Sequence, residues 1–393
     1  MLRPALLLLC AARSASSAAS SPPLASVNLV HALWAAWGTT DAPLASIAEA
    51  ARSACAERGF SVVRVAGSPF WPQQGWPLYF SNESAYWAAA APFAAALETS
   101  GCAPIWSVFW NIFALPDYFS EPLGAMVEGA RGGAPSRSFT ASLSYIDAFV
   151  SRFAAQPTTG WELTNELNLL MDLDMSTQCP CCNGPGAPKT RSRADNISTD
   201  GGVALLSAWA ARIRAADPLR RPVSTGLALA RPAAEHLRAS YLLPHRDWTP
   251  DTFDEFSANM AAISSCCEWA SVHLYPGPDN ARFGKTGAND PTIVWYAQAA
   301  AAAANKSLLL GEFGEQPGPG ASPNAPRPYV DGMLRALAQP QPPGLDNTVA
   351  ALAWTWEFGD QNGTSNTGWA LWPGVTQGVI DSLMNYNGNR TRA

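Results

Sequence analysis

The stretch GWELTNELN, residues 160–168, decides the fold. It follows the turn-like QPTT of residues 156–159 and alternates large and polar side chains, a pattern typical of a β-strand. The stretch places an amide and a carboxylate, Asn165 and Glu166, at the end of that strand. Because a glutamate at the end of a buried strand is unfavourable unless something uses it, we expect a functional site there.

A second stretch, SLLLGEFG at residues 307–314, repeats this design with an apolar run, the carboxylate of Glu312 and glycines. In a parallel barrel the carboxyl ends of all strands meet at one rim. Glu166 and Glu312 can therefore face each other although they are far apart in the sequence. A pair of carboxyl groups is the equipment for cleaving a glycosidic bond.

Strand and helix patterns alternate eight times along the chain. The expected strands are 26–30, 60–65, 105–110, 160–166, 222–226, 269–275, one that begins near 308, and 349–356. The expected helices are 44–58, 84–98, 142–155, 202–216, 253–263, one that ends with the alanine run 299–304, 329–337 and 378–384. Eight such units predict an α/β fold, a single (β/α)8 TIM barrel with long βα loops that forms one catalytic domain over residues 22–393.

Composition limits the partners of this chain. A formal charge of −6 over 393 residues argues against binding to nucleic acid or to an anionic membrane. Sixteen tryptophans are many for this length. The core can absorb some of them, but sugar-binding clefts also use aromatic faces. A polysaccharide or oligosaccharide is therefore the expected partner, and a monomer is the expected state.

The first residues have the pattern of a secretory signal. A basic start is followed by the apolar run 4–12 and by small residues to about 21. The run is too short to span a bilayer, and a disordered Ala/Ser tail is the alternative. We therefore expect residues 1–21 to be removed and the protein to be secreted. Five Asn-X-Ser/Thr sequons fit this route, at Asn82, Asn196, Asn305, Asn362 and Asn389.

Seven cysteines remain once Cys10 has left with the signal. Export favours disulfides between them, and the odd number leaves one thiol over. We expect a bond between the cluster at 179–182 and the pair Cys266-Cys267, although the sequence alone leaves the pairing open. Zinc is the weaker alternative because no histidine lies near the cluster. No metal or other cofactor is expected.

Further polar and aromatic residues fall at the expected rim. They are Arg64, Trp110, Asn111, Asn165, Glu166, His273, Tyr275, Glu312, and Trp354 or Trp356. Each alone has an ordinary alternative: His273 can be a core imidazole, and Glu166 can cap the next helix. Their joint occurrence at the same end of several strands favours a site.

The proposed chemistry needs one protonated and one ionised carboxyl group. Arg64 near Glu312 would hold that carboxyl ionised, with a hydrogen bond from Tyr275. The charge of Glu312 would in turn help to keep Glu166 protonated. Asn165 can bind the 2-hydroxyl of a sugar, and a tryptophan at the end of the eighth strand would form the floor for the ring.

These motifs resemble glycoside hydrolase family five. The residues that carry the resemblance are WELTNE at 161–166, VHLYP at 272–276 and LGEFG at 310–314. The segment from 213 to 226 looks like eukaryotic endo-β-1,4-mannanases of that family. Two positions depart from the family pattern. Leu167 replaces the usual proline, and Trp110-Asn111 stands where a histidine is frequent.

The resemblance implies that Glu166 is the general acid/base and Glu312 the nucleophile of a retaining hydrolase. It implies supporting roles for Arg64, Asn165, His273, Tyr275 and Trp354. The expected activity is that of a secreted endo-β-1,4-mannanase. A β-1,4-glucanase or an exo-β-glycosidase of the same clan is the alternative, and a carbohydrate-binding pseudoenzyme is the alternative from another class.

Overall fold

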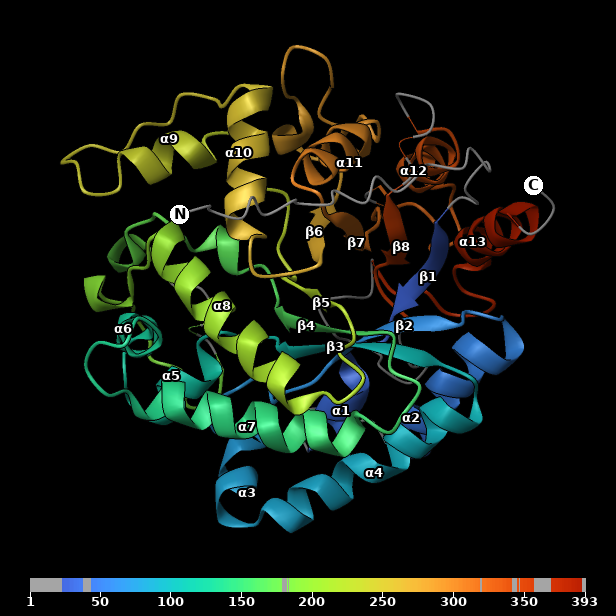
Figure 1. Ribbon diagram of the computed structural model, residues 1–393. Coiled ribbons are helices and arrows are strands. Elements are labelled where there is room, and N and C mark those ends of the chain that lie inside the picture. Colours follow the sequence, from blue (N-terminus) through green and yellow to red (C-terminus); the bar gives the residue numbers. More distant parts are fainter. Residues whose placement is uncertain are drawn as a thin grey trace, which may run out of the picture.

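The computed structural model describes residues 23–37, 44–178, 182, 184–318, 320–340, 345, 347–356 and 369–390. Eight parallel strands pair in chain order and close into one barrel, which helices surround (Figure 1). The expected (β/α)8 barrel is therefore confirmed. The expected signal at 1–21 lies outside the described residues. No described helix has the length and apolar character needed to cross a membrane.

The strands lie within a few residues of the predicted positions. They are β1 Leu24–Asn28, β2 Val62–Ala66, β3 Ala103–Phe109, β4 Gly160–Thr164, β5 Val223–Ser224, β6 Trp269–Leu274, β7 Ser307–Phe313 and β8 Thr348–Ala353. The main difference is that β4 ends at Thr164, before Glu166. The backbone of Glu166 has a φ of 55°, a left-handed conformation that turns the chain out of the strand.

Thirteen α-helices lie in the described part of the chain. They are α1 His31–Ala36, α2 Leu44–Ala51, α3 Trp76–Ser81, α4 Glu83–Thr99, α5 Ala114–Tyr118, α6 Leu123–Ala130, α7 Arg137–Phe153, α8 Thr199–Ala216, α9 Ala234–Ala239, α10 Phe253–Ile263, α11 Ile293–Ala303, α12 Pro328–Ala338 and α13 Gln377–Arg390. A π-helical turn, Arg52–Glu57, continues α2, and 3₁₀ turns occupy Leu167–Leu169, Met175–Thr177, Arg193–Asp195 and Pro278–Asn280.

Capping side chains explain where the long helices begin. Asn82 accepts from the backbone of Ala85 at the start of α4, and Ser136 accepts from Phe139 at the start of α7. Thr252 begins α10 with a capping box. Because Ser136 is the cap, α7 begins earlier than the predicted 142.

The interior of the barrel is divided into two halves. At the amino ends of the strands, Ile105, Trp269 and Leu309 belong to a small buried apolar cluster of their own. A side chain at Gly160 would collide with the Trp269 ring at 2.7 Å, so β4 must begin with a glycine there. Toward the carboxyl ends the buried residues become polar, and this polar half positions the site.

The predicted disulfide between the 179–182 cluster and Cys266-Cys267 is wrong. Cys182 is disulfide-bonded, but Cys266 and Cys267 are free thiols. The reason lies in the topology: Cys182, the described cysteine of that cluster, follows β4 at the carboxyl rim, whereas Cys266 and Cys267 precede β6 at the opposite end of the barrel. A disulfide instead joins Cys55 and Cys102, with the Cα atoms 5.5 Å apart.

Candidate active site

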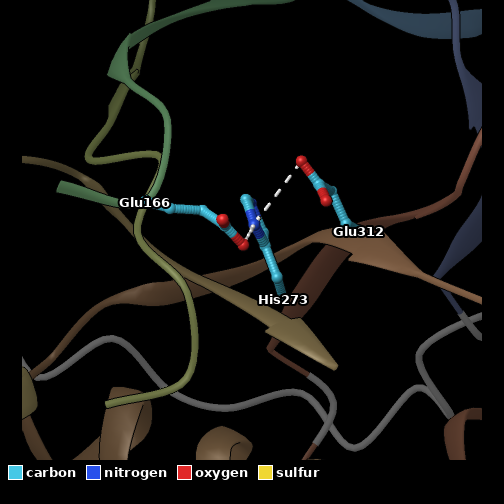
Figure 2. Close-up of side chains that lie close together, drawn as sticks. All are labelled: Glu166, His273 and Glu312. Atoms are coloured by element: carbon cyan, nitrogen blue, oxygen red, sulfur yellow. Dashed lines mark hydrogen bonds and ion pairs between the residues drawn. The ribbon is translucent and has the colours of Figure 1, made fainter. Parts of the chain in front are cut away.

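Glu166 and Glu312 face each other at the carboxyl rim of the barrel. Glu312 lies near the end of β7, and Glu166 lies just after β4, where its N–H donates to the Gly226 carbonyl at 2.8 Å. One oxygen of each carboxyl group and a ring nitrogen of His273 all lie within 4.8 Å of one another. Figure 2 shows the imidazole between the two carboxyl groups. His273 Nδ1 lies 2.9 Å from Glu166 Oε1 and 3.5 Å from Glu312 Oε1.

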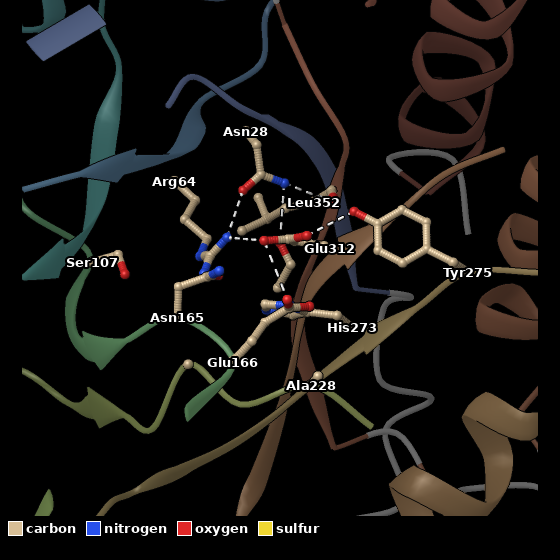
Figure 3. A network of polar contacts seen from close by, with 12 residues as sticks. Asn28, Arg64, Ser107, Asn165, Glu166, Ala228, His273, Tyr275, Glu312 and Leu352 are labelled. Atoms are coloured by element: carbon tan, nitrogen blue, oxygen red, sulfur yellow. Dashed lines mark hydrogen bonds and ion pairs between the residues drawn. The ribbon is translucent and has the colours of Figure 1, made fainter. Parts of the chain in front are cut away.

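Arg64 on β2 is the centre of the polar network in Figure 3. Its guanidinium is fully buried and donates to Glu312 Oε1 at 2.7 Å and to Asn165 Oδ1 at 2.7 Å. It also contacts Glu162 Oε1 at 2.7 Å and Asn28 Oδ1 at 3.1 Å. Since Asn165 Oδ1 accepts from Arg64, the side-chain group that Asn165 can offer to a ligand is its Nδ2 donor.

Glu312 is held at both oxygens. Arg64 binds Oε1, and the Tyr275 hydroxyl donates to Oε2 at 2.7 Å. Burial nevertheless raises the pKa of Glu312, against the opposing effects of Arg64 and Tyr275. Arg64 therefore favours the ionised form of Glu312 as expected, but the net pKa of this carboxyl group is raised because burial outweighs that effect. The two donors fix the orientation of the group and reduce the effect of burial.

Glu166 differs from Glu312 in its access to solvent. Its side chain is 33% exposed, whereas that of Glu312 is 6% exposed, so Glu166 opens toward the cavity. Burial raises the pKa of Glu166, and Arg64 lowers it. Its side chain is hydrogen-bonded to His273, whereas Arg64 and Tyr275 both hold Glu312, so Glu166 is the less strongly held of the two carboxyl groups.

His273 is a neutral imidazole at ordinary pH. Burial lowers the pKa of His273 to about 4. One ring nitrogen of a neutral imidazole donates and the other accepts. His273 can therefore donate a hydrogen bond from Nδ1–H to an ionised Glu166, or, in the other tautomer, accept a hydrogen bond at Nδ1 from a protonated Glu166.

A cavity of about 460 Å³ opens above these residues. Its lining is Phe70, Trp110, Asn111, Ile112, Phe113, Asn165, Glu166, Leu169, Leu170, Gln178, Glu312 and Trp354. The Trp110 ring lies 4.3 Å from the Arg64 guanidinium and 5.9 Å from the stacked Trp354 ring. The cavity thus combines an aromatic wall with two carboxyl groups, a combination that suits a sugar ring.

Of the predicted rim residues, Trp356 lies elsewhere and Asn111 is tied into a loop. Trp356 does not reach the cavity: it is completely buried against Phe60 and Trp372. Because β8 ends at Ala353, the strand period no longer places residue 356 on the same side as Trp354. Asn111 lines the cavity, but its side chain donates to the Phe70 carbonyl and accepts from the Phe113 N–H, so it shapes the loop.

Asn28 and Glu162 are site residues that the sequence reasoning missed. Asn28 donates to the carbonyls of Gly311 and Leu352 and accepts from Arg64, which joins β1 to the strands around Glu312. Glu162 has no exposed surface and binds Arg64. A charged residue two positions before Thr164, on the inner face of a barrel strand, was the available signal for Glu162.

A cation is a poor fit to this site. Glu166, His273 and Glu312 are close enough to share a metal ion. However, both oxygens of Glu312 already accept from Arg64 and Tyr275, and a buried guanidinium at 2.7 Å would repel a second cation. The arrangement is better suited to proton transfer and nucleophilic attack.

Of the comparisons with known proteins, the one with solved structures finds matches for this chain. No protein-family model matches the chain, and no curated protein matches it. The barrel resembles solved mannanases and family 5 glycoside hydrolases. The resemblance expected from the sequence motifs is thus confirmed at the level of the fold.

Three of these structures illustrate the likeness. An endo-1,4-β-mannanase from Rhizomucor miehei is 13% identical, covers 95% of this chain and 99% of its own, and has a TM-score of 0.59. A family 5 mannosidase variant from the same organism, in complex with mannosyl-fructose, is 12% identical, covers 95% of this chain and 94% of its own, and has a TM-score of 0.62. A family 5 protein variant from Streptomyces cattleya, bound to Manβ1-4GlcNAc, is 15% identical, covers 94% of this chain and 82% of its own, and has a TM-score of 0.60.

Proposed function

We propose that this chain is a retaining β-glycoside hydrolase that cleaves β-1,4-linked mannan as an endo-β-1,4-mannanase. The observation that carries the proposal is the spacing of Glu166 and Glu312, whose oxygens lie within 4.8 Å of each other. Retaining enzymes hold their two carboxyl groups about 5–5.5 Å apart, whereas inverting enzymes keep about 6.5–9.5 Å for a water molecule. The short spacing favours direct attack by one carboxylate on the sugar.

Glu312 is the proposed nucleophile. Arg64 and Tyr275 fix both of its oxygens, so its attacking oxygen is oriented before substrate arrives. These donors also favour ionisation of Glu312 ahead of Glu166. The carboxylate attacks the anomeric carbon and forms a glycosyl ester as the leaving oxygen departs.

Glu166 is the proposed acid and base. Its partly exposed carboxyl group can reach the leaving oxygen and give it a proton in the first step. In the second step the same group, now ionised, takes a proton from the water that cleaves the ester. His273 can hydrogen-bond both protonation states of Glu166, because a neutral imidazole can accept a hydrogen bond from the protonated carboxyl group or donate one to the ionised group.

Binding of the sugar is assigned to the aromatic wall and to Asn165. Trp354 provides the floor for the ring, and Trp110 extends the apolar surface. Asn165 presents its Nδ2 donor for the 2-hydroxyl, a contact that strengthens in the transition state. The likeness in fold to a mannanase, a mannosidase and a protein bound to Manβ1-4GlcNAc supports a mannose-containing substrate.

Export is part of the proposal. The signal pattern at residues 1–21 and the disulfide between Cys55 and Cys102 both support passage through an oxidising compartment. Exo-acting mannosidase activity is the second candidate, favoured by the likeness to the Rhizomucor miehei mannosidase.

A reducing-sugar assay on mannan, glucomannan, cellulose and xylan tests the proposal. Endo action on mannan lowers viscosity early, whereas exo action releases mannose with little change in viscosity. Glu312→Ala should abolish product formation, while Glu98→Ala, which removes an exposed glutamate on α4, should keep full activity. Product formation by folded Glu312→Ala, or no activity of the wild type on any of the four polymers, would overturn the proposal.

A further inference from the structure

Arg64 is shared between two carboxylates, only one of which takes part in the proposed reaction. Glu162 Oε1 and Glu312 Oε1 each lie 2.7 Å from the guanidinium. Neither Arg64 nor the Glu162 side chain has any exposed surface. Glu162 sits on β4 four residues before Glu166, and its position inside the barrel keeps it out of reach of a sugar in the cavity.

The reaction changes the charge that surrounds Arg64. When Glu312 forms an ester with the sugar, it loses its negative charge. A buried guanidinium without a counter-ion is strongly unfavourable. Glu162 remains as a counter-ion throughout. Before the reaction, Glu162 also competes with Glu312 for the same guanidinium and so weakens the hold of Arg64 on the nucleophile.

We propose that Glu162 is a positioning residue that tunes the nucleophile Glu312 through Arg64. This inference rests on the proposed function. When the charge of Glu162 is removed, Arg64 has Glu312 as its single carboxylate partner, and this stabilises the ionised nucleophile. The pKa of Glu312 then falls and its carboxylate becomes a weaker nucleophile.

The isosteric change Glu162→Gln tests this role. The acid limb of the pH profile of kcat/KM reports ionisation of the nucleophile in the free enzyme, so it should move to lower pH. The plateau should also fall, because a carboxylate with a lower pKa is a weaker nucleophile. Glu162→Asp keeps the charge but lengthens the contact, so its acid limb should move in the same direction by a smaller amount.

Glu268→Gln is the matched control, since it breaks an ion pair of 2.7 Å with Arg214 at the opposite end of the barrel and should leave the acid limb in place. If Glu162→Gln does not fold, Glu162→Asp decides the question. An unchanged limb in the folded variants, or a limb moved to higher pH, would overturn the role of Glu162. An inactive wild type would instead overturn the proposed function, so the two failures are distinguishable.

An independent observation concerns the two adjacent thiols at the other end of the barrel. Cys266 Sγ and Cys267 Sγ lie 2.8 Å apart. Both residues are in the turn between α10 and β6, outside any helix or strand. Arg214 and Lys306 donate to the carbonyls of Cys266 and Cys267, each at 2.6 Å, which fixes the turn.

The geometry points to Cys266 and Cys267 as a redox-sensitive pair that closes a disulfide between neighbouring residues. Cys266 is the more exposed thiol, and its hydrogen bond with Cys267 lowers the pKa of Cys266. Its thiolate attacks an external disulfide such as glutathione disulfide and releases one thiol. Cys267 then loses its proton, attacks Cys266 Sγ and releases the second thiol. Two electrons and two protons pass to the external disulfide.

Adjacent Cα atoms are about 3.8 Å apart, which is shorter than the usual separation across a disulfide. A strained disulfide is reduced more easily. The pair should therefore open in a less reducing buffer than Cys55–Cys102, whose Cα atoms are 5.5 Å apart.

Glutathione buffers of graded ratio test this pair in the full chain. Samples are quenched with acid, alkylated in denaturant, digested and measured by mass spectrometry. Under oxidising conditions the peptide with residues 266 and 267 should carry no alkyl group and should be two hydrogens lighter than the unmodified dithiol peptide. Cys267→Ser should leave Cys266 open to alkylation or to a mixed disulfide with glutathione. Two alkylated residues in the most oxidising buffer, or a bond from either one to another cysteine, would overturn the inference.

Discussion

The two halves of the barrel interior are built from the same strands but have opposite chemistry. Strand β6 begins with Trp269 inside an apolar cluster and reaches His273 between two carboxyl groups four residues later. Strand β3 changes in the same way from Ile105 to Ser107. The amino half needs only apolar contacts, whereas each buried charge in the carboxyl half requires named partners. The chemical groups are thus confined to the carboxyl half, and substitutions in the two halves should differ in their effect on activity.

Among variants that keep the nucleophile, the largest effect is expected from Glu166→Ala in the polar half. General acid–base catalysis contributes about 10²–10⁴-fold, so kcat on mannan should fall by that factor. A dinitrophenyl β-mannoside needs no proton on its leaving group, so formation of the glycosyl ester from it should be much less affected. Burst kinetics with the two substrates measure this difference. Equal losses in the ester-forming step on both would contradict the role of Glu166.

Arg64→Met should reduce stability as well as activity. It leaves Glu162 and Glu312 buried without their shared cation, and breaking a buried pair by removing one partner lowers the free energy of unfolding by about 3–5 kcal/mol. Urea denaturation measures the change. Trp269→Ala in the apolar half is the matched test, since a tryptophan truncated in a core also lowers stability by about 3–5 kcal/mol. At a temperature where both variants are folded, only Arg64→Met should lose most of its kcat.

The pH dependence of stability should report His273. Burial lowers the pKa of His273 to about 4, from 6.5 in the unfolded chain. Between these values the unfolded chain binds a proton that the folded protein does not, so stability is present above pH 6.5 and is lost as the pH falls toward 4. Over this range the free energy of unfolding of His273→Gln should fall by roughly 2–3 kcal/mol less than that of the wild type. Equal slopes of unfolding free energy against pH in the two proteins would contradict a neutral, buried His273.

The smallest effect is expected at the aromatic wall. Trp354→Ala should raise KM by roughly tenfold, equivalent to about 1.4 kcal/mol of lost sugar contact. Trp356→Phe is the control: it alters a buried tryptophan two residues away, so it should affect stability and leave KM unchanged. A KM change in Trp356→Phe as large as that in Trp354→Ala would remove the distinction between the two residues.

Much of the architecture could be predicted because it depends on local patterns. Eight alternating strand and helix signals define the barrel, and the carboxyl ends of the strands bring Glu166, His273 and Glu312 together. The predicted contacts of Arg64 and Tyr275 with Glu312 are also present.

What the sequence did not reveal depends on distant contacts. Asn28 and Glu162 belong to the site through their contacts with Arg64, and only Glu162 left a sequence signal, an inward-facing charge on a barrel strand. Trp356 was placed at the rim because the strand was expected to continue, but β8 ends at Ala353. The net rise in the pKa of Glu312 could not be predicted, because burial, which no sequence pattern measures, outweighs the nearby cation. The predicted cysteine pairing failed because Cys182 and the pair Cys266-Cys267 lie at opposite ends of the barrel.

The most direct test of the central claim is the configuration of the first product. Proton NMR during the first minutes of hydrolysis of a β-1,4-mannooligosaccharide distinguishes the two anomers before they interconvert. If Glu312 attacks the sugar and Glu166 serves as acid and then base, the β-anomer should appear first. An initial α-anomer would mean that water attacks directly, and would contradict the account of the two carboxyl groups.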